Sequence, residues 1–209
     1  MSTVRKIQPV SDNYDKQLTY AEQIVRYNRA IKGGFFFEAL LIDYAMLEDR
    51  LKSMIYHMAF LYDRDKTGVW KKTKPNLEII VTECEPDKAV NQFKINSMKG
   101  KISLIRAVFL WASTTTGGYA DNRFLKTLKT QCESVDIGGV LETLDQVCEW
   151  SDYRNEVIHG LLNKNVKSLD TEICKRAEDG MKYARYLDNQ LKVLKKGNKI
   201  RKSVNALIK

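Results

Sequence analysis

The sequence is poor in residues that interrupt helices and in residues that hold metals. It has 3 prolines and 11 glycines among 209 residues, so long helices can run without a break. It has 2 histidines and 4 cysteines, and no two cysteines stand at C-x-x-C spacing. We therefore expect no zinc site and no other metal or cofactor, and we interpret the cysteines as buried or free thiols in a reducing compartment. They are Cys84, Cys132, Cys148 and Cys174.

The sequence also lacks a long apolar run. No stretch reaches the roughly eighteen apolar residues that a membrane span needs. The most apolar region, residues 34–62, is interrupted by charged residues such as Glu38, Asp49 and Arg50. The first twenty residues are polar and have no apolar core of the kind found in signal peptides. We therefore expect a cytoplasmic protein that makes no membrane contact.

Acidic residues are fewer than basic ones. Lys and Arg number 35 against 26 Asp and Glu, which gives a formal net charge of +9. A basic surface attracts polyanions, and nucleic acid is the commonest polyanion in a cell. Apolar residues make up 44% and charged residues 29%, as in a folded domain of ordinary size. Composition alone favours nucleic acid as a partner only weakly.

Apolar residues at steps of three and four predict a chain made of helices. The clearest stripe lies in residues 35–62, and no pair of strands joined by hairpin-turn residues stands out. The sequence therefore predicts an all-α, single-domain antiparallel bundle of about five to six helices. The expected helices span residues 12–32, 35–62, 89–112 or 95–112, 123–133, 140–162 and 168–196, with breaks at the glycine pairs 33–34 and 138–139.

Three segments are expected to lie outside this regular pattern. Residues 1–11 are predicted to be a flexible tail before a helical domain at 12–196, and residues 197–209 a basic C-terminal tail. Residues 63–88 hold a glycine and two prolines, so we expect a long connection there, with room for a short helix or extended piece at 77–81. The segment Ser113 to Gly118 lacks the lysine that follows in a P-loop, and we interpret it as an interhelical turn.

Arg154, Asn155 and His159 form the sequence's best candidate for chemistry. Asn155 and His159 are four residues apart and share one face of a helix. Arg154 lies about 140° away from His159 around the helix, so spacing alone does not bring the three groups into one site. A partner subunit could supply a second copy of the set. The other histidine, His57, sits in an apolar helical stretch, which is typical of a packed residue.

These three side chains suffice to cleave RNA without a metal. Imidazole accepts or donates protons near neutral pH. A guanidinium group binds phosphate oxygens in a fork and stabilises the added negative charge of the transition state. The 2′-hydroxyl would attack its own 3′ phosphate, with His159 moving protons and Arg154 holding the charge. The same residues on an ordinary charged helix face would have no chemical role.

Residues 153–161 read YRNEVIHGL, which resembles the signature of the HEPN superfamily: an arginine, four to six residues, then a histidine. Residues 36–40 (FFEAL) and 47–51 (LEDRL) resemble an early family helix that carries an acidic residue. The resemblance covers about residues 14–196, with 63–88 as an insertion. It implies a homodimer with metal-independent endoribonuclease activity, as in toxin, phage-defence and RNA-processing members.

The resemblance also assigns roles to residues. Arg154, Asn155 and His159 become the active-site set, with Glu48, or behind it Asp43, as a supporting acid. It suggests an antitoxin or a nucleotidyltransferase-like protein as a partner. Some superfamily members are inactive, so a non-catalytic helical protein that binds RNA or a partner protein stays an alternative. We see no helix-turn-helix of a DNA-binding regulator. Basic residues that could add weak RNA affinity are Lys71, Lys72, Lys74, Lys199, Arg201 and Lys202.

Overall fold

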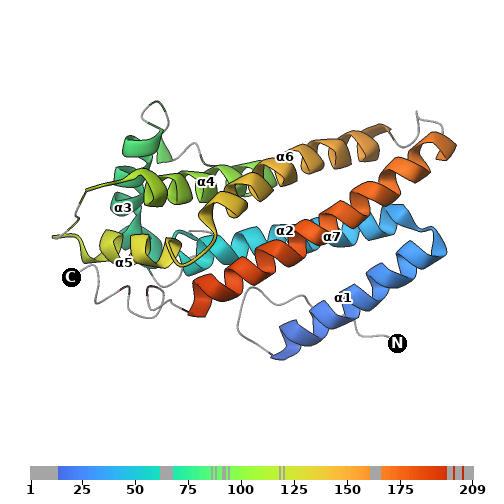
Figure 1. Ribbon diagram of the computed structural model, residues 1–209, viewed down its shortest axis with the longest axis horizontal. Coiled ribbons are helices and arrows are strands. Elements are labelled where there is room, and N and C mark those ends of the chain that lie inside the picture. Colours follow the sequence, from blue (N-terminus) through green and yellow to red (C-terminus); the bar gives the residue numbers. More distant parts are fainter. Residues whose placement is uncertain are drawn as a thin grey trace.

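The protein, seen in a computed structural model, is all-α over the residues that the structure describes (Figure 1). The described residues are 14–61, 68–85, 87, 89–90, 93, 95–117, 119, 121–160, 166–196, 200 and 204. They contain no strand. The helices in this part of the chain are α1 (Tyr14–Gly33), α2 (Phe36–His57), α3 (Val69–Cys84), α4 (Met98–Thr114), α5 (Arg123–Cys132), α6 (Ile137–Gly160) and α7 (Val166–Lys196).

Helix α2 is the central column of the bundle. It packs against α1, α4 and α7, while α4 also packs against α3, α5 and α6. Figure 1 shows α3 and α5 at one end of the molecule, while α1, α2, α6 and α7 extend to the other end. The stripe predicted for α2 is buried because its apolar residues recur at steps of three and four. Those with no exposed surface are Leu40, Leu47, Leu51, Met54 and Ile55.

The turn between α1 and α2 places the start of α2 beside the end of α6. Gly34 has φ +75°, a conformation that glycine adopts without strain, and the Phe35 amide donates to the Ala30 carbonyl at 2.8 Å. This is a Schellman ending for α1. A second, small core follows, in which the start of α2 packs onto α6 and α7. Its members are Phe36, Phe37, Tyr153, Val157 and Ile173.

The prediction of a connection over residues 63–88 is wrong for most of its length, because α3 occupies 69–84. Pro75 lies inside this helix on its exposed face. Proline has no N–H, and the backbone carbonyl that would accept from it can bond to water there. Val69, Leu77 and Ile80 are buried on the other face. Lys71, Lys72 and Lys74, which made the segment look like a loop, are the exposed face of a helix.

The predicted helix break at the glycine pair 138–139 is also wrong. Both glycines lie in the first turn of α6, which begins at Ile137. The chain turns earlier, and Asp136 accepts a hydrogen bond from the Gly139 amide at 3.0 Å, as an N-terminal capping residue does. This bond, with a second one from Tyr186, holds the pKa of the Asp136 carboxyl below its usual range.

The ends of the chain are described only in part. Residues 1–11 lie outside the described residues. In the segment predicted to be a basic tail, Ile200 and Val204 are buried against the main core, so at these two positions the chain packs on the helical domain. Lys199, Arg201 and Lys202 lie outside the described residues. None of the helices in the described ranges is long and apolar enough to span a membrane.

Candidate functional site

Arg154 is held at the junction of α6 and α2. Its Cζ lies 4.0 Å from the centroid of the Tyr44 ring of α2, within the range of a cation–π contact. Its Nη1 donates a hydrogen bond of 3.1 Å to Oδ1 of Asn155. Its Nε is buried and has no hydrogen-bond partner among the residues that the structure describes. The guanidinium group is therefore fixed in place by two uncharged partners.

Tyr44 is the contact that the sequence did not reveal. It follows the apolar stripe of α2, so its spacing predicted a core residue, but its half-buried ring supports Arg154. Burial raises the pKa of the Tyr44 phenol, the charge of Glu48 raises it further, and Arg154 lowers it. Tyr44 thus stays an uncharged platform at neutral pH. Only a long-range contact between two helices gives it this role, and spacing within one helix carries no signal of that contact.

His159 lies on the last turn of α6 and is exposed. It follows Arg154 by five residues, which corresponds to a rise of about 7.5 Å and a rotation of about 140° around the helix. Asn155 shares its face, four residues earlier. The structure thus joins Arg154 to Asn155 directly, and a single α6 leaves His159 pointing in a different direction from Arg154.

The two acidic residues named as supporting acids lie close to Tyr44 in the chain, but their described contacts are with other groups. Glu48 accepts a hydrogen bond of 2.8 Å from Nζ of Lys101, a residue of α4 that is only 4% exposed. Asp43 is fully buried and packs toward Trp150 of α6 and Gly180 of α7. The contacts of Arg154 among the described residues are with an aromatic ring, that of Tyr44, and with the side-chain amide of Asn155.

The three predicted basic residues of α3 do not lie near this site within one chain. Lys71, Lys72 and Lys74 are exposed on α3, at the end of the molecule away from the last turn of α6 (Figure 1). Lys74 pairs with Glu78 at 3.3 Å, which is a surface ion pair of small energetic effect. Toward His159, the exposed face of α6 carries the carboxylates of Glu149, Asp152 and Glu156.

The segment predicted as a turn, Ser113 to Gly118, begins inside α4, and Gly118 lies outside the described residues. Ser113 and Thr114 are the last residues of α4, and residues 115–117 continue without regular structure. Residues 114–117 line a pocket of about 430 Å³ together with Glu83. Glu83 Oε2 accepts hydrogen bonds from Trp111 Nε1 at 3.0 Å and from the Tyr119 hydroxyl at 2.5 Å. A carboxylate in this position repels phosphate.

The cysteines and the acidic residues form no second candidate site in the described part of the chain. All four cysteines are free; Cys132 is fully buried, and burial raises its thiol pKa far above the usual range. Within the described ranges, no three residues among His, Cys, Asp and Glu are grouped so that they could hold a metal ion. The Arg154–Asn155–Tyr44 cluster and nearby His159 are therefore the strongest candidate site in the described part of the chain.

Comparisons with known proteins return no match: no family model matches the chain, and no curated protein or solved structure matches it.

Proposed function

We propose that this chain is a metal-independent endoribonuclease of the HEPN type, active as a homodimer, and that its fold is a HEPN-like bundle. Two features support the proposal together. The described chain is all-α, and its next-to-last long helix carries an arginine and a histidine that are separated by four residues. The described geometry adds that Arg154 and Asn155 act as one hydrogen-bonded unit.

The state of Arg154 is the observation that carries the proposal. Its guanidinium is positioned by Tyr44 and Asn155, yet no carboxylate among its described contacts neutralises it. A buried or half-buried cation without a counter-charge is costly, and a phosphate oxygen is the ligand whose charge and geometry suit it. Arg154 is thus suited to bind the phosphate under attack.

The chemistry follows from the three side chains. His159 takes the proton of the 2′-hydroxyl, and the 2′ oxygen attacks the adjacent phosphorus. Arg154 stabilises the added negative charge, and the bond from phosphorus to the 5′ oxygen breaks. A second proton transfer, from a histidine, neutralises the leaving 5′ oxygen. The products are a 2′,3′-cyclic phosphate and a 5′-hydroxyl, and DNA is not a substrate because it lacks the 2′-hydroxyl.

A homodimer explains how Arg154 and His159 could meet. The 140° between them on one helix is spanned if two α6 helices face each other, so that Arg154 of one chain lies opposite the other chain's His159. Asp152 on the exposed face of α6 already pairs with Lys99 at 2.6 Å, so a second chain would have to offset the carboxylates of Glu149 and Glu156. Toxin or phage-defence action, with an antitoxin or nucleotidyltransferase-like partner, belongs to the same proposal and rests on the resemblance alone.

One observation favours a second candidate function, a non-catalytic helical protein that binds RNA or a partner. The stacking of Arg154 on Tyr44 would also stabilise a bundle that performs no chemistry. In that case His159 would be an ordinary exposed residue, and its neighbours Glu149 and Glu156 an ordinary acidic helix face. The two functions differ in whether His159 matters for RNA.

Cleavage of labelled single-stranded RNA in the presence of a metal chelator tests the proposal. We expect the parent protein to leave 2′,3′-cyclic phosphate ends and to spare an all-2′-deoxy oligonucleotide. His159→Ala should lower the rate at least about 100-fold, the usual contribution of a general acid or base. His57→Ala is the matched control and should cut normally once folded. Equal cutting by His159→Ala would refute the enzyme assignment.

A further inference from the structure

Asp43 is a carboxyl group buried where three helices meet. It has no exposed surface, and neither of its oxygens has a hydrogen-bond partner among the described residues. It lies on the core-facing stripe of α2, between Leu40 and Leu47. Most buried polar groups in proteins are paired, so an unpaired buried acid requires an explanation.

Gly180 shows how closely the helices approach at Asp43. A Cβ atom at Gly180 of α7 would lie 3.0 Å from Asp43 Oδ2 and 2.9 Å from Cζ2 of Trp150 on α6. Glycine within a helix is less favourable than alanine by about 1 kcal/mol, so only this packing accounts for its presence in the middle of α7. The carboxyl of Asp43, the indole of Trp150 and the bare backbone of Gly180 form one contact between α2, α6 and α7.

The groups around Asp43 favour the uncharged acid. Burial raises its pKa to about 8, and Arg185 of α7 opposes this shift only in part. From α1, the Tyr27 hydroxyl points to the carbonyl of Ala177 on α7 at 3.2 Å, and the pKa of Tyr27 is raised by burial and then by the charge of Asp43. Glu178 and Cys174 of α7 also raise the pKa of Tyr27, and Arg185 lowers it. A carboxylate at this junction would have no hydrogen-bond partner among the described residues and only the partial compensation of Arg185.

The contact between α2, α6 and α7 at Asp43 lies next to the proposed site along both α2 and α6. Asp43 precedes Tyr44, the ring on which Arg154 stacks. Trp150 precedes Arg154 by one turn of α6, and its Nε1 donates to the carbonyl of Arg176 on α7 at 2.7 Å. Any separation of α2, α6 and α7 at Asp43 therefore displaces the platform and the helix that together hold Arg154.

We propose that Asp43 is a positioning residue: its uncharged carboxyl keeps α2, α6 and α7 in contact, and loss of its proton separates them and frees Arg154 from Tyr44. The consequence for RNA rests on the proposed function, because it takes Arg154 as the phosphate-binding group. The consequence for the contact between α2, α6 and α7 does not depend on the proposed function. The protein is thus most effective below pH 8 and loses the organisation of the Arg154 site above it.

The first test follows the junction without RNA. Tryptophan emission of the parent and of Asp43→Asn is measured from pH 6 to pH 10, and the difference between the two isolates the change at Trp150. We expect a transition near pH 8 in the parent that is missing from Asp43→Asn. Asp121→Asn, an exposed aspartate, is the matched control and should titrate like the parent. Asp43→Leu provides a second uncharged variant should the amide itself perturb folding.

The second test asks whether Arg154 moves. Labelling of Arg154 by phenylglyoxal, quantified by mass spectrometry, should accelerate in the parent relative to Asp43→Asn as the pH rises through 8. Identical labelling of the two proteins at every pH, or identical emission curves, would overturn the proposal. Unfolding supplies a third measure, since the unfolding equilibrium constant of the parent should rise about tenfold per pH unit relative to Asp43→Asn between about pH 4 and 8.

The third test uses a single-stranded 2′-O-methyl oligonucleotide, which binds without being cut. Its affinity for the parent should fall as the pH rises through 8, and Asp43→Asn should lack this fall. If the oligonucleotide binds but both proteins respond to pH alike, Asp43 does not position Arg154 and the proposal fails. If neither protein binds or cuts RNA while emission and Arg154 labelling still depend on Asp43, the proposed function fails and the junction stands.

Discussion

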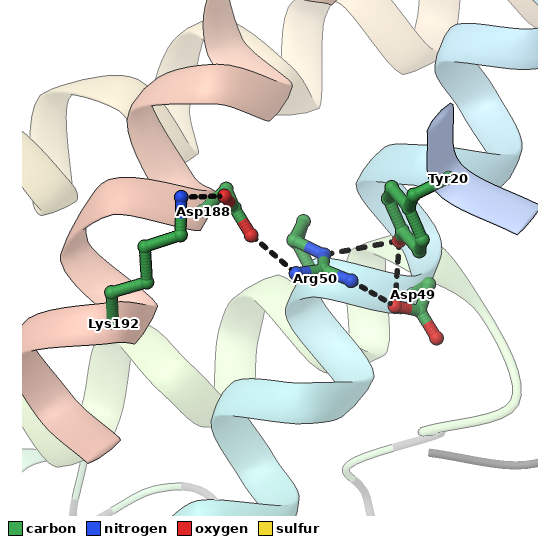
Figure 2. A network of polar contacts seen from close by, with 5 residues as sticks. All are labelled: Tyr20, Asp49, Arg50, Asp188 and Lys192. Atoms are coloured by element: carbon green, nitrogen blue, oxygen red, sulfur yellow. Dashed lines mark hydrogen bonds and ion pairs between the residues drawn. The ribbon is translucent and has the colours of Figure 1, made fainter. Parts of the chain in front are cut away.

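Arg50 and Arg154 each stack on a tyrosine, yet their surroundings differ. Arg50 of α2 lies with Cζ 4.2 Å from the Tyr20 ring centroid, and Arg154 lies 4.0 Å from that of Tyr44. Arg50 also donates hydrogen bonds from Nε to the Tyr20 hydroxyl at 3.0 Å, from Nη2 to Asp49 at 2.8 Å and from Nη1 to Asp188. Figure 2 shows these contacts. Arg154 has one amide partner and an unpaired buried Nε.

The difference shows that the carboxylates, not the aromatic contact, separate a structural arginine from one suited to a ligand. Asp49 and Asp188 neutralise Arg50, and Asp188 in turn pairs with Lys192 at 2.7 Å. This network joins α1, α2 and α7 (Figure 2). Arg154 has a similar contact with a tyrosine ring but no carboxylate among its described partners. We infer that Arg50 serves the fold and Arg154 serves the site, and the following substitutions test that contrast.

The largest expected effect is on stability, at Arg50. Its side chain is only 12% exposed, and Arg50→Ala would leave two carboxylates without their shared partner. We expect a loss of about 3 kcal/mol in the free energy of unfolding, measured by urea titration. RNA cleavage per folded molecule should stay unchanged. A folded Arg50→Ala protein with parental stability would contradict the claim that Arg50 stabilises the fold.

Arg154→Ala should lower RNA cleavage and leave the stability nearly unchanged. We expect kcat for RNA cleavage to fall about 100-fold or more, since a group that stabilises transition-state charge is lost. Stability should change little, because an uncompensated cation and its cost disappear together. Arg154→Lys keeps the charge but loses the fork, and should recover only part of the rate. Equal stability losses at Arg50 and Arg154 would show that both are structural.

Substitutions of Tyr44 and Tyr20 should separate cleavage from stability in the same way, with smaller effects. Tyr44→Leu removes the platform of Arg154 and should lower kcat about tenfold, in line with a cation–π contact of 0.5 to 2 kcal/mol. Tyr44→Phe keeps the ring and should cut normally. Tyr20→Phe loses the hydroxyl that bonds to Asp49 and Arg50, and should reduce stability by about 1 kcal/mol with no change in cleavage. Loss of cutting in Tyr20→Phe would contradict the division of roles.

The smallest expected effect comes from making Arg154 resemble Arg50. Asn155→Asp places a carboxylate beside Arg154 at nearly unchanged size. We expect the protein to become more stable by about 0.5 kcal/mol, as for a partly exposed ion pair, and to cut RNA more slowly. Thermal unfolding and initial cleavage rates measure the two effects. Faster cutting by this variant would show that Arg154 does not need to be free of counter-charge.

Much of the fold could be predicted because it depends on local spacing. The stripe of α2 and the stripe of α7, with Met181, Leu187 and Leu194 buried, are readable from steps of three and four. Helix α3 differs from the expectation because Val69, Leu77 and Ile80 are buried along it, and this burial offsets the cost of a proline inside the helix. The start of α6 was misplaced because Asp136 caps the helix and the glycines that follow it are helical.

The candidate site was predictable only in part. Arg154, Asn155 and His159 stand together in the chain, so their chemistry could be anticipated. Tyr44 could not be identified as the support of Arg154, because that contact joins residues 110 positions apart. Asp43 was named as an acid, but its burial against Gly180 depends on how three helices cross, and no spacing within α2 encodes this.

Mixing two inactive variants tests the central claim most directly, namely that two chains together cut RNA with Arg154 and His159. Purified Arg154→Ala and His159→Ala are mixed under conditions that exchange subunits, heterodimers are verified by native mass spectrometry, and RNA cleavage is measured in a metal chelator. A heterodimer then holds one intact Arg154–His159 pair, and we expect the mixture to recover about one quarter of the parental rate. Verified heterodimers that cut no faster than either variant alone would contradict the account.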